Sequence, residues 1–317
     1  MHNLKSFRAA LLIVVLAVAP LVSVAQQTLS LKRDFVNENK NRATITTDLR
    51  VDVKKGPHGI SKGAEDGDIH MAGRDNVIKL PLVAEILNAR FEKDAVKFLQ
   101  GLADGKSVEV TGVWRVWFEH PGGEQVQGKT VEIPDDSNPP HLFELHPITQ
   151  FGAFDCLDSF IEIKNSNTKP PRVFEAHPAT DAFGEYEKLT AAIRGTATRV
   201  FISSRKSGFN YTDFMMELVG KPKDMGDSLM VMARVFDPAD PETPLFDELR
   251  RMVFVKGSPP EKELRTKKKG DTMHVLGIPR VNLNEVMAIV DKNGTKELSP
   301  VKLPYEMIIA ALLPTSD

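Results

Sequence analysis

Two distant segments of the chain share one pattern, and this pattern constrains the fold most strongly. They are GKSVEVTGVWRV at 105–116 and GDTMHVLGIPRV at 270–281, which align without gaps. Each opens on a glycine, alternates apolar residues, carries a mid-segment glycine and ends on Arg-Val. Alternation with a period of two is typical of strands, and a glycine within a strand marks a bend. Small barrels need such corners, so the repeat predicts two small β-barrels. Shared turn chemistry in an unrepeated β protein is the alternative.

The rest of the chain predicts a mainly β protein with a few helices. Short β-branched stretches alternate with turns rich in glycine, proline and asparagine. A helix is expected within 91–105, which has helical apolar spacing and ends on a glycine. A second is expected within 178–195, where Phe183, Tyr186, Leu189 and Ile193 would share one face. The Pro- and Lys-rich stretch at 166–172 marks the best domain boundary.

Residues 1–25 have the pattern of a secretory signal peptide. Lys5 and Arg8 precede an apolar run at 9–18, and small residues lead to a cleavage position after Ala25. The run is too short to span a membrane well. We therefore expect a chain exported to the periplasm or the medium, with no membrane span after cleavage.

Composition limits the function classes. The chain has 317 residues, of which 41% are apolar and 26% charged, as in globular proteins. A formal net charge of -2 argues against bulk affinity for nucleic acid. The single cysteine, Cys156, excludes an intrachain disulfide and is expected in the core. An exported chain without disulfides fits the bacterial periplasm better than a disulfide-stapled extracellular module.

The densest polar cluster lies at EDGDIH. In a strand, Asp66, Asp68 and His70 would share one face, where oxygen and imidazole ligands could hold a divalent metal. His146 would complete the set if barrel closure brought its strand close. The alternative is an acidic turn whose aspartates bind their own backbone.

Further candidate ligand-binding residues lie at strand ends. His120 ends one predicted strand, and Glu144 and His146 project from one side of another. A Glu beside a His could serve as acid and base, or could form a structural hydrogen-bonded pair. Trp114 and Trp117 would point to opposite faces, so one is expected in the core and the other could stack on a base or sugar.

The stretches FELHPIT at 143–149 and FEAHPAT at 174–180 look alike but lie in different settings. The first belongs to an alternating strand, whereas the second runs into a predicted helix. We therefore expect His146 to be a site residue and His177 to lie at a helix entry. The run Lys267 to Lys269 is expected to be a solvated turn.

Three motifs resemble a known group. EDGDIHMAG, VEVTGVWRVWFEHP and HLFELHPIT together resemble bacterial secreted proteins of unassigned function that look like compact OB-like barrels. The resemblance covers about residues 50–155 and implies an OB-like first domain, without an activity to carry over. The segment at 270–281 also resembles the late strand of OB-fold barrels.

These observations predict two OB-like β-barrels in tandem, joined by a helical linker. The expected division is a signal peptide at 1–25, a polar lead-in at 26–44, a first barrel at 45–164, a linker with a helix at 165–195 and a second β-rich domain at 196–317.

The sequence lacks a nucleophile elbow, a phosphate-binding loop and a dinucleotide fingerprint. The leading hypothesis is an exported binding protein for an unknown ligand or protein partner. The alternatives are a metal-assisted hydrolase of phosphoesters or glycans that uses the Asp66, Asp68, His70 and His146 cluster, and oligonucleotide or glycan binding on a barrel face.

Overall fold

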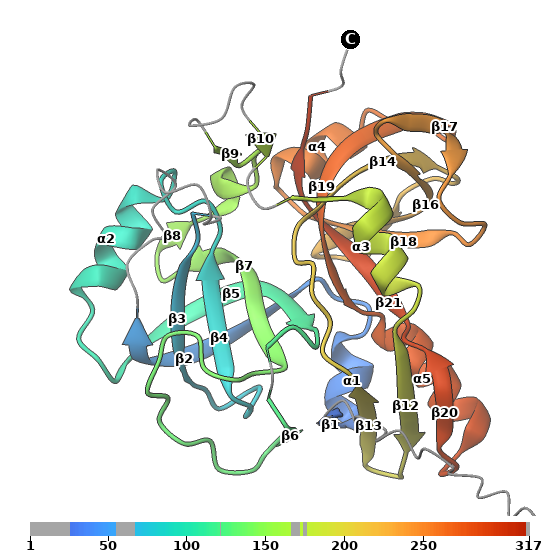
Figure 1. Cartoon of the computed structure of the whole chain (residues 1–317). Helices are drawn as coiled ribbons and strands as arrows, with labels where there is room; N and C mark the ends of the chain where they lie inside the picture. The colour runs from blue at the N-terminus through green and yellow to red at the C-terminus, as the bar shows by residue number, and fades with distance from the viewer. Residues whose placement is uncertain (1–25, 55–66, 121, 166–171, 174–175, 315–317) are drawn as a thin grey trace, which may run out of the picture.

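The apolar alternation of the sequence closes into two five-stranded barrels, which lie beside a third sheet (Figure 1). The computed structural model describes residues 26–54, 67–120, 122–165, 172–173 and 176–314. The prediction of a mainly β chain with few helices is confirmed. Among the described residues, no helix is long and apolar enough to cross a membrane.

The first barrel is a meander closed by two further strands. Its strands are β2 (Thr44–Lys54), β3 (Ile69–Arg74), β4 (Leu82–Ile86), β5 (Lys106–Val116) and β7 (Phe143–Phe151). The meander β2-β3-β4 is antiparallel, β5 pairs with β2, and β7 closes the barrel between β5 and β4, parallel to β4. The helix α2 (Lys93–Gly101) joins β4 to β5, which confirms the helix predicted within 91–105.

The second barrel repeats this connectivity. Its strands are β14 (Thr212–Leu218), β16 (Ser228–Asp237), β18 (Arg250–Val255), β19 (Thr272–Val281) and β21 (Tyr305–Leu312). The meander β14-β16-β18 is antiparallel, β19 pairs with β14, and β21 closes the barrel between β19 and β18, parallel to β18. The helix α4 (Pro259–Leu264) precedes β19, as α2 precedes β5. The repeated segments of the sequence are β5 and β19, which occupy the same place in the two barrels.

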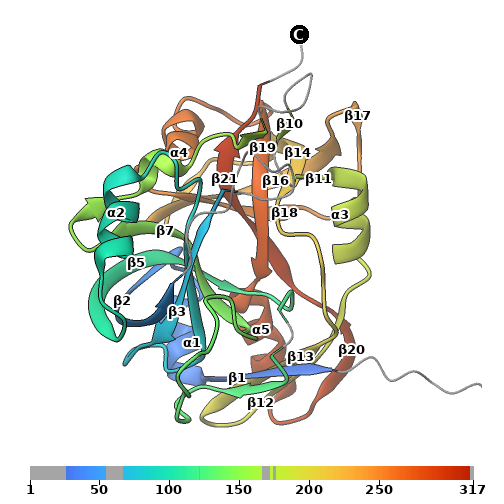
Figure 2. The ribbon, with the colours of Figure 1, turned by 60° about the vertical axis from the view of Figure 1, so that its left-hand side comes forward.

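The third sheet combines one strand from before the barrels, two from between them, and one from within the sequence of each barrel (Figure 2). Its order is β20 (Leu298–Lys302), β12 (Thr190–Gly195), β13 (Arg199–Ser204), β1 (Gln27–Lys32) and β6 (Glu124–Val126). The helix α5 (Leu283–Asn293) packs on β12. The segment expected to be a loosely packed lead-in forms β1 and α1 (Arg33–Asn39), because Leu29, Leu31 and Val36 are apolar enough to join the core.

The helical linker expected at 165–195 is not confirmed. Within its described part, α3 (Ala179–Tyr186) ends at Tyr186 and the chain enters β12. Leu189 and Ile193 have helical spacing from Phe183, but strand pairing with β13 and β20 places Ile193 in the sheet instead. The third sheet also ties the two barrels together, so a simple tandem of separate barrels is not confirmed.

Short elements complete the described chain. They are β8 (Phe154–Asp155), η2 (Leu157–Ser159), β9 (Lys164–Asn165), β10 (Arg172–Val173), β11 (His177–Pro178), β15 (Lys223–Asp224) and β17 (Asp240–Pro244).

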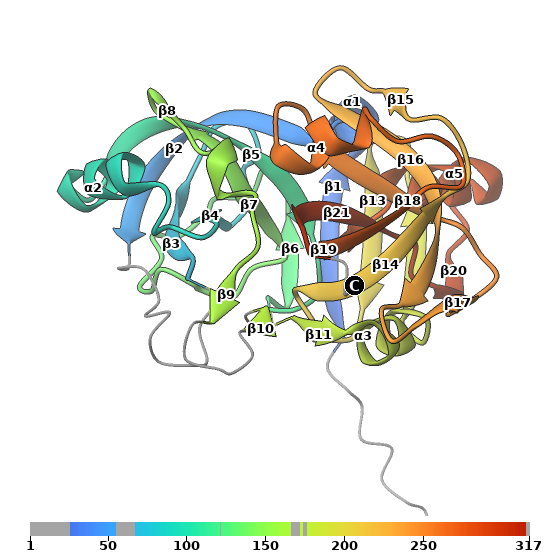
Figure 3. The same cartoon turned by 90° about the horizontal axis from the view of Figure 1, so that it is seen from above.

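The two barrels lie side by side when seen from above (Figure 3). One large apolar cluster includes interior residues of both barrels, such as Leu145 and Met307. A second, smaller cluster contains Tyr211 together with Val113 and Ile278, which hold the same position in the two repeated segments. These two residues alternate along their strands with the interior residues, so they lie on the outside of the barrels. The outer faces of the barrels therefore meet, and polar residues on these faces are buried.

Candidate functional site

Strand alternation assembles a polar cluster on the outer face of the first barrel. On β4, Ala84 and Ile86 point into the core, so Glu85 between them points outward. The same alternation turns Glu144 and His146 outward from β7 and His70 outward from β3. Because β3, β4 and β7 are neighbours, these side chains gather at one place.

His146 lies at the centre of this cluster and is fully buried. Its Nε2 lies 3.2 Å from Asp68 Oδ2 and 2.8 Å from the hydroxyl of Tyr211. The Tyr211 hydroxyl also donates to Asp68 Oδ2 at 2.7 Å. Tyr211 precedes β14, so a residue of the second barrel covers the site in the first.

The other ring nitrogen of His146 faces two further carboxylates. Nδ1 lies 3.6 Å from Glu85 Oε2 and 3.6 Å from Glu144 Oε1, which are electrostatic contacts beyond hydrogen-bond range. Within the described part of the chain, Nδ1 has no hydrogen-bond partner. Glu85 Oε2 also lies 3.5 Å from His70 Nε2, so Glu85 links the two histidines.

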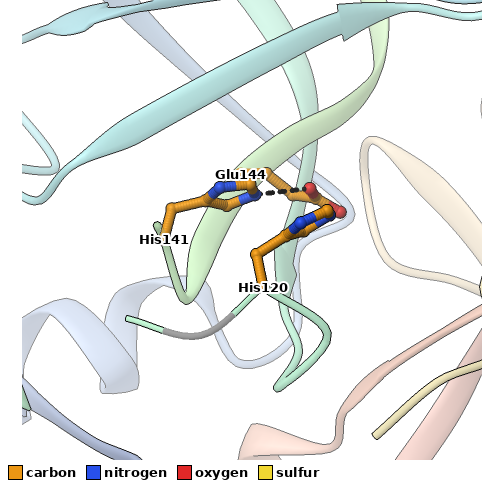
Figure 4. Close-up of side chains that lie close together, drawn as sticks. All are labelled: His120, His141 and Glu144. Carbon is orange, nitrogen blue, oxygen red and sulfur yellow. Dashed lines mark hydrogen bonds and ion pairs between the residues drawn. The ribbon is translucent and has the colours of Figure 1, made fainter. Parts of the chain in front are cut away.

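Glu144 connects this centre to a second group of side chains nearer the surface (Figure 4). Its Oε2 lies 3.0 Å from His141 Nε2, and the His141 ring stacks on His120 with centroids 4.6 Å apart. Its Oε1 accepts a hydrogen bond from Arg115, which also pairs with Glu119 at 2.9 Å. Of these residues, His120 is only partly buried, so the group reaches the rim of the barrel.

The electrostatics of the cluster favour a charged imidazole. Burial alone would lower the pKa of His146, but Glu85, Asp68 and Glu144 outweigh it and raise this pKa well above its ordinary value. Burial opposes ionisation of Glu144 too, yet Arg115, His141 and His146 hold its pKa well below the usual range. At the rim, burial and the neighbouring His141 lower the pKa of His120.

Two groups of atoms have the composition and spacing of a metal site. Asp68, Glu85 and His146 each offer one ligand atom, and these atoms lie within 4.8 Å of one another. His120, His141 and Glu144 meet the same condition. Imidazole nitrogen combined with carboxylate oxygen suits first-row divalent metals such as Zn²⁺ or Mn²⁺.

The predicted site residues fall into three sets. Asp68, His70 and His146 lie in one cluster, linked through Glu85, with Glu144 beside them. Asp66 lies outside the described residues. His120 lies with His141 and Glu144, one step away from the Asp68 group.

The two tryptophans are not surface platforms. Trp114 is 1% exposed and Trp117 is 3% exposed, and both belong to the large apolar cluster. One was expected in the core, and both are there; the alternative that the other could stack on a base or sugar is not supported, because neither ring is accessible. Trp117 lies beyond the end of β5 and packs against Tyr186 of α3, whereas the guanidinium of Arg280 from the second barrel lies over the ring of Trp114. Cys156 is also buried, as expected, and burial raises the pKa of its thiol to about 12.

Sequence reasoning missed four members of the cluster. Glu85 carried a readable signal, since it is the one charged residue within the apolar stretch LPLVAEIL. Tyr211 and Arg115 had no comparable signal, because their roles depend on contacts between the barrels. His141 contacts Glu144 only three residues along the chain, so its place in the sequence was a signal that went unused.

The second barrel lacks this polar cluster at matching positions. Arg115 faces Glu144 across β5 and β7, as Arg280 faces Glu306 across β19 and β21. We therefore align Arg115 with Arg280 and Glu144 with Glu306. The strand pairings then assign to each residue of β3, β4 and β7 an equivalent residue of β16, β18 and β21. The positions of Asp68, His70, Glu85 and His146 are taken in the second barrel by Ser228, Met230, Val253 and Ile308.

Comparison of the chain with protein-family models and with curated proteins finds no match.

Proposed function

We propose that this chain is an exported binding protein that holds a divalent cation on the outer face of its first barrel. The ligands would be Asp68, Glu85 and His146, with Glu144 beside them. Export rests on the signal-peptide pattern of residues 1–25. The meander, helix and parallel closure of each barrel support the OB-like assignment, a fold that commonly carries ligands on its surface.

The observation that carries the proposal is the difference between the two barrels. Both close with the same connectivity and both keep a buried Arg–Glu pair. Only the first buries Asp68, Glu85 and His146, where the second has Ser228, Val253 and Ile308. Burying charged groups opposes folding unless they are well compensated. Since the barrel closes without them in the second copy, a ligand is the best reason for their presence in the first.

A proton and a metal would compete for this site. With no cation bound, the carboxylates favour the protonated imidazole of His146. A metal needs the neutral ring, so its binding would release a proton and weaken as the pH falls. The ligand atoms offered by Asp68, Glu85 and His146 lie within 4.8 Å of one another, so one ion could contact all three.

A held ion fits the site better than a hydrolytic centre. A catalytic metal needs an open position that faces the substrate. In the part of the chain that the structure describes, the side chains of Asp68, Glu85 and His146 are at most 5% exposed. Metal-assisted hydrolysis is therefore the less favoured alternative.

The test is metal analysis of protein purified without chelator, comparing wild type with His146→Gln and His274→Gln. His274 is the matched control, because it also bonds a carboxylate, Asp213, at 2.6 Å but lies in the second barrel. We expect about one equivalent of zinc or manganese in wild type and in His274→Gln, and a large loss in His146→Gln.

A second variant guards against misfolding. Glu85→Gln keeps the volume of the side chain and removes one ligand charge, and circular dichroism would establish that it folds. A folded Glu85→Gln protein should bind added Zn²⁺ at least tenfold more weakly, because a charged ligand is lost. Wild-type protein that neither retains metal nor is stabilised by added Zn²⁺ or Mn²⁺ would overturn the proposal.

A further inference from the structure

A basic groove runs over another part of the first barrel, apart from the Asp68 cluster. It consists of a cavity of about 680 Å³ over β2 and β3, and a neighbouring cavity of about 320 Å³ that shares Asn76 and Lys79 with it. Six cationic side chains line the two cavities: Lys32, Arg42, Arg50, Arg74, Lys79 and Lys129. Three carboxylates line them, those of Glu38, Asp48 and Asp75. The chain as a whole has slightly more acidic than basic residues, so this excess of cations is local.

One of the lining carboxylates is engaged in shaping the groove. Asp75 accepts hydrogen bonds from the backbone N–H groups of Val77 and Lys79 and from the Thr47 hydroxyl. These bonds fix the turn between β3 and β4. The negative charge of Asp75 is therefore directed into the turn, so Asp75 repels an anionic ligand less than a free carboxylate would.

Lys79 is held where the two cavities meet. Its backbone has φ of 54°, a left-handed conformation that disfavours residues with a Cβ atom. The Lys79 carbonyl accepts a hydrogen bond from the Gly128 N–H at 2.9 Å, which ties the turn to the loop carrying Lys129. An unfavourable backbone maintained by its surroundings at a cavity junction points to a functional role for the residue.

A buried carboxylate, that of Asp52, orients the two arginines of the larger cavity. Asp52, whose side chain is 4% exposed, pairs with Arg74 through two hydrogen bonds of 2.8 and 3.0 Å. The same carboxylate lies 3.5 Å from Arg50. One buried charge thus orients two guanidinium groups, and a net positive charge remains for a ligand.

The lining identifies the chemical class of that ligand. Among the described residues, no aromatic side chain lines the larger cavity, and Phe35, which lines the smaller one, is only 9% exposed and packs in the apolar core, so bases of an oligonucleotide would find little ring surface to stack on. Beside the cations stand hydrogen-bonding groups of Asp48, Asn76 and Ser107, which suit hydroxyl groups. A polymer with both carboxylates and hydroxyls matches this mixture. We propose that the groove binds an acidic oligosaccharide built of uronate units.

The test uses fluorescence anisotropy with a labelled short oligogalacturonate. The groove variant is Lys79→Gln with Lys129→Gln. The control is Lys268→Gln with Lys269→Gln, which removes the same charge from an exposed turn of the second barrel. We expect the groove variant to bind about tenfold more weakly, from two lost charge contacts, and the control to bind within about twofold of wild type.

Three outcomes would overturn the inference. Wild type could fail to bind the oligogalacturonate, the two double variants could bind equally, or an oligothymidylate of matching charge could bind as tightly. The last result would show recognition of charge alone. The metal proposal is independent of this assay, because no residue of the Asp68 cluster lines the groove.

Discussion

Arg115 and Arg280 reach between the two barrels in opposite directions. Arg115 Nε donates to the Pro279 carbonyl at 2.9 Å, and Arg280 Nη1 donates to the Trp114 carbonyl at 3.0 Å. Each acceptor is the residue just before the other arginine. Each arginine is also paired with a buried glutamate on the next strand. The repeat in the sequence thus forms a reciprocal contact that joins the barrels.

Loss of one of these arginines should strongly destabilise the protein. We expect Arg280→Met to lower the free energy of unfolding by about 3 kcal/mol, because buried Glu306 keeps only Arg251, 3.1 Å away, as a charged partner and the Trp114 carbonyl loses its donor. Urea denaturation would measure this. Arg234→Met is the control, since Arg234 and Glu217 form an exposed pair whose loss should cost less than about 1 kcal/mol. Equal effects of the two changes would contradict a special role for the buried pair.

The hydroxyl of Tyr211 should contribute to docking of the barrels. We expect Tyr211→Phe to lower the free energy of unfolding by about 1–3 kcal/mol, because Asp68 and His146 both lose a buried hydrogen bond. The exposed hydroxyl pair of Thr46 and Thr111 provides a control, Thr46→Val, with little expected effect. A Tyr211→Phe protein as stable as wild type would show that the contact is dispensable.

His146 should make the stability of the metal-free protein depend on pH. Its pKa is raised in the folded state, so its contribution is fully present below the unfolded pKa of about 6.5 and is lost as pH rises through the folded value. In EDTA, the stability difference between wild type and His146→Gln should therefore shrink with rising pH. Denaturation at several pH values tests this, and a difference that grows with pH would exclude it. With Zn²⁺ present the trend should reverse, because metal replaces the proton.

Ionisation of Glu92 should also lower the stability of the protein as the pH rises. Burial, together with Asp158, raises its pKa to about 7. Its contribution is present below about pH 4.5 and is lost as pH rises through about 7. Glu92→Gln should therefore be more stable than wild type at pH 8, by about 1 kcal/mol after allowing for solvent screening. Glu109→Gln, at an exposed position of β5, is the control, and thermal unfolding at pH 5 and pH 8 is the measurement.

The strands and the helix that depend on residues close together in the sequence were predicted correctly. Period-two alternation and the mid-strand glycines located β5 and β19, and helical spacing located α2. The predicted helix within 178–195 was too long, because pairing with β13 and β20 overrides the helical spacing of Ile193. The apolar residues of β1 were present in the sequence, but their partners lie far along the chain.

The site was only half predictable for the same reason. Asp68, His70 and His146 could be proposed from spacing and barrel closure. Tyr211 and Arg115 could not, since they act across the contact between the barrels. The two similar stretches FELHPIT and FEAHPAT both meet at Tyr211: the first through its hydroxyl, and the second through the His177 N–H, which donates to the Tyr211 carbonyl at 2.7 Å. His177 lies just before α3, where a helix entry was expected.

The place of β1 has a consequence for synthesis on the ribosome. This strand is made before either barrel, yet its antiparallel partner at Arg199–Ser204 is made long after it. Loop closure over such a separation is slow and becomes favourable only when both ends are present. A nascent chain that ends before β13 therefore has no antiparallel partner for β1. A fragment that stops after the first barrel should leave Leu29 and Leu31 exposed to water, a target for chaperones and proteases until the rest of the chain arrives.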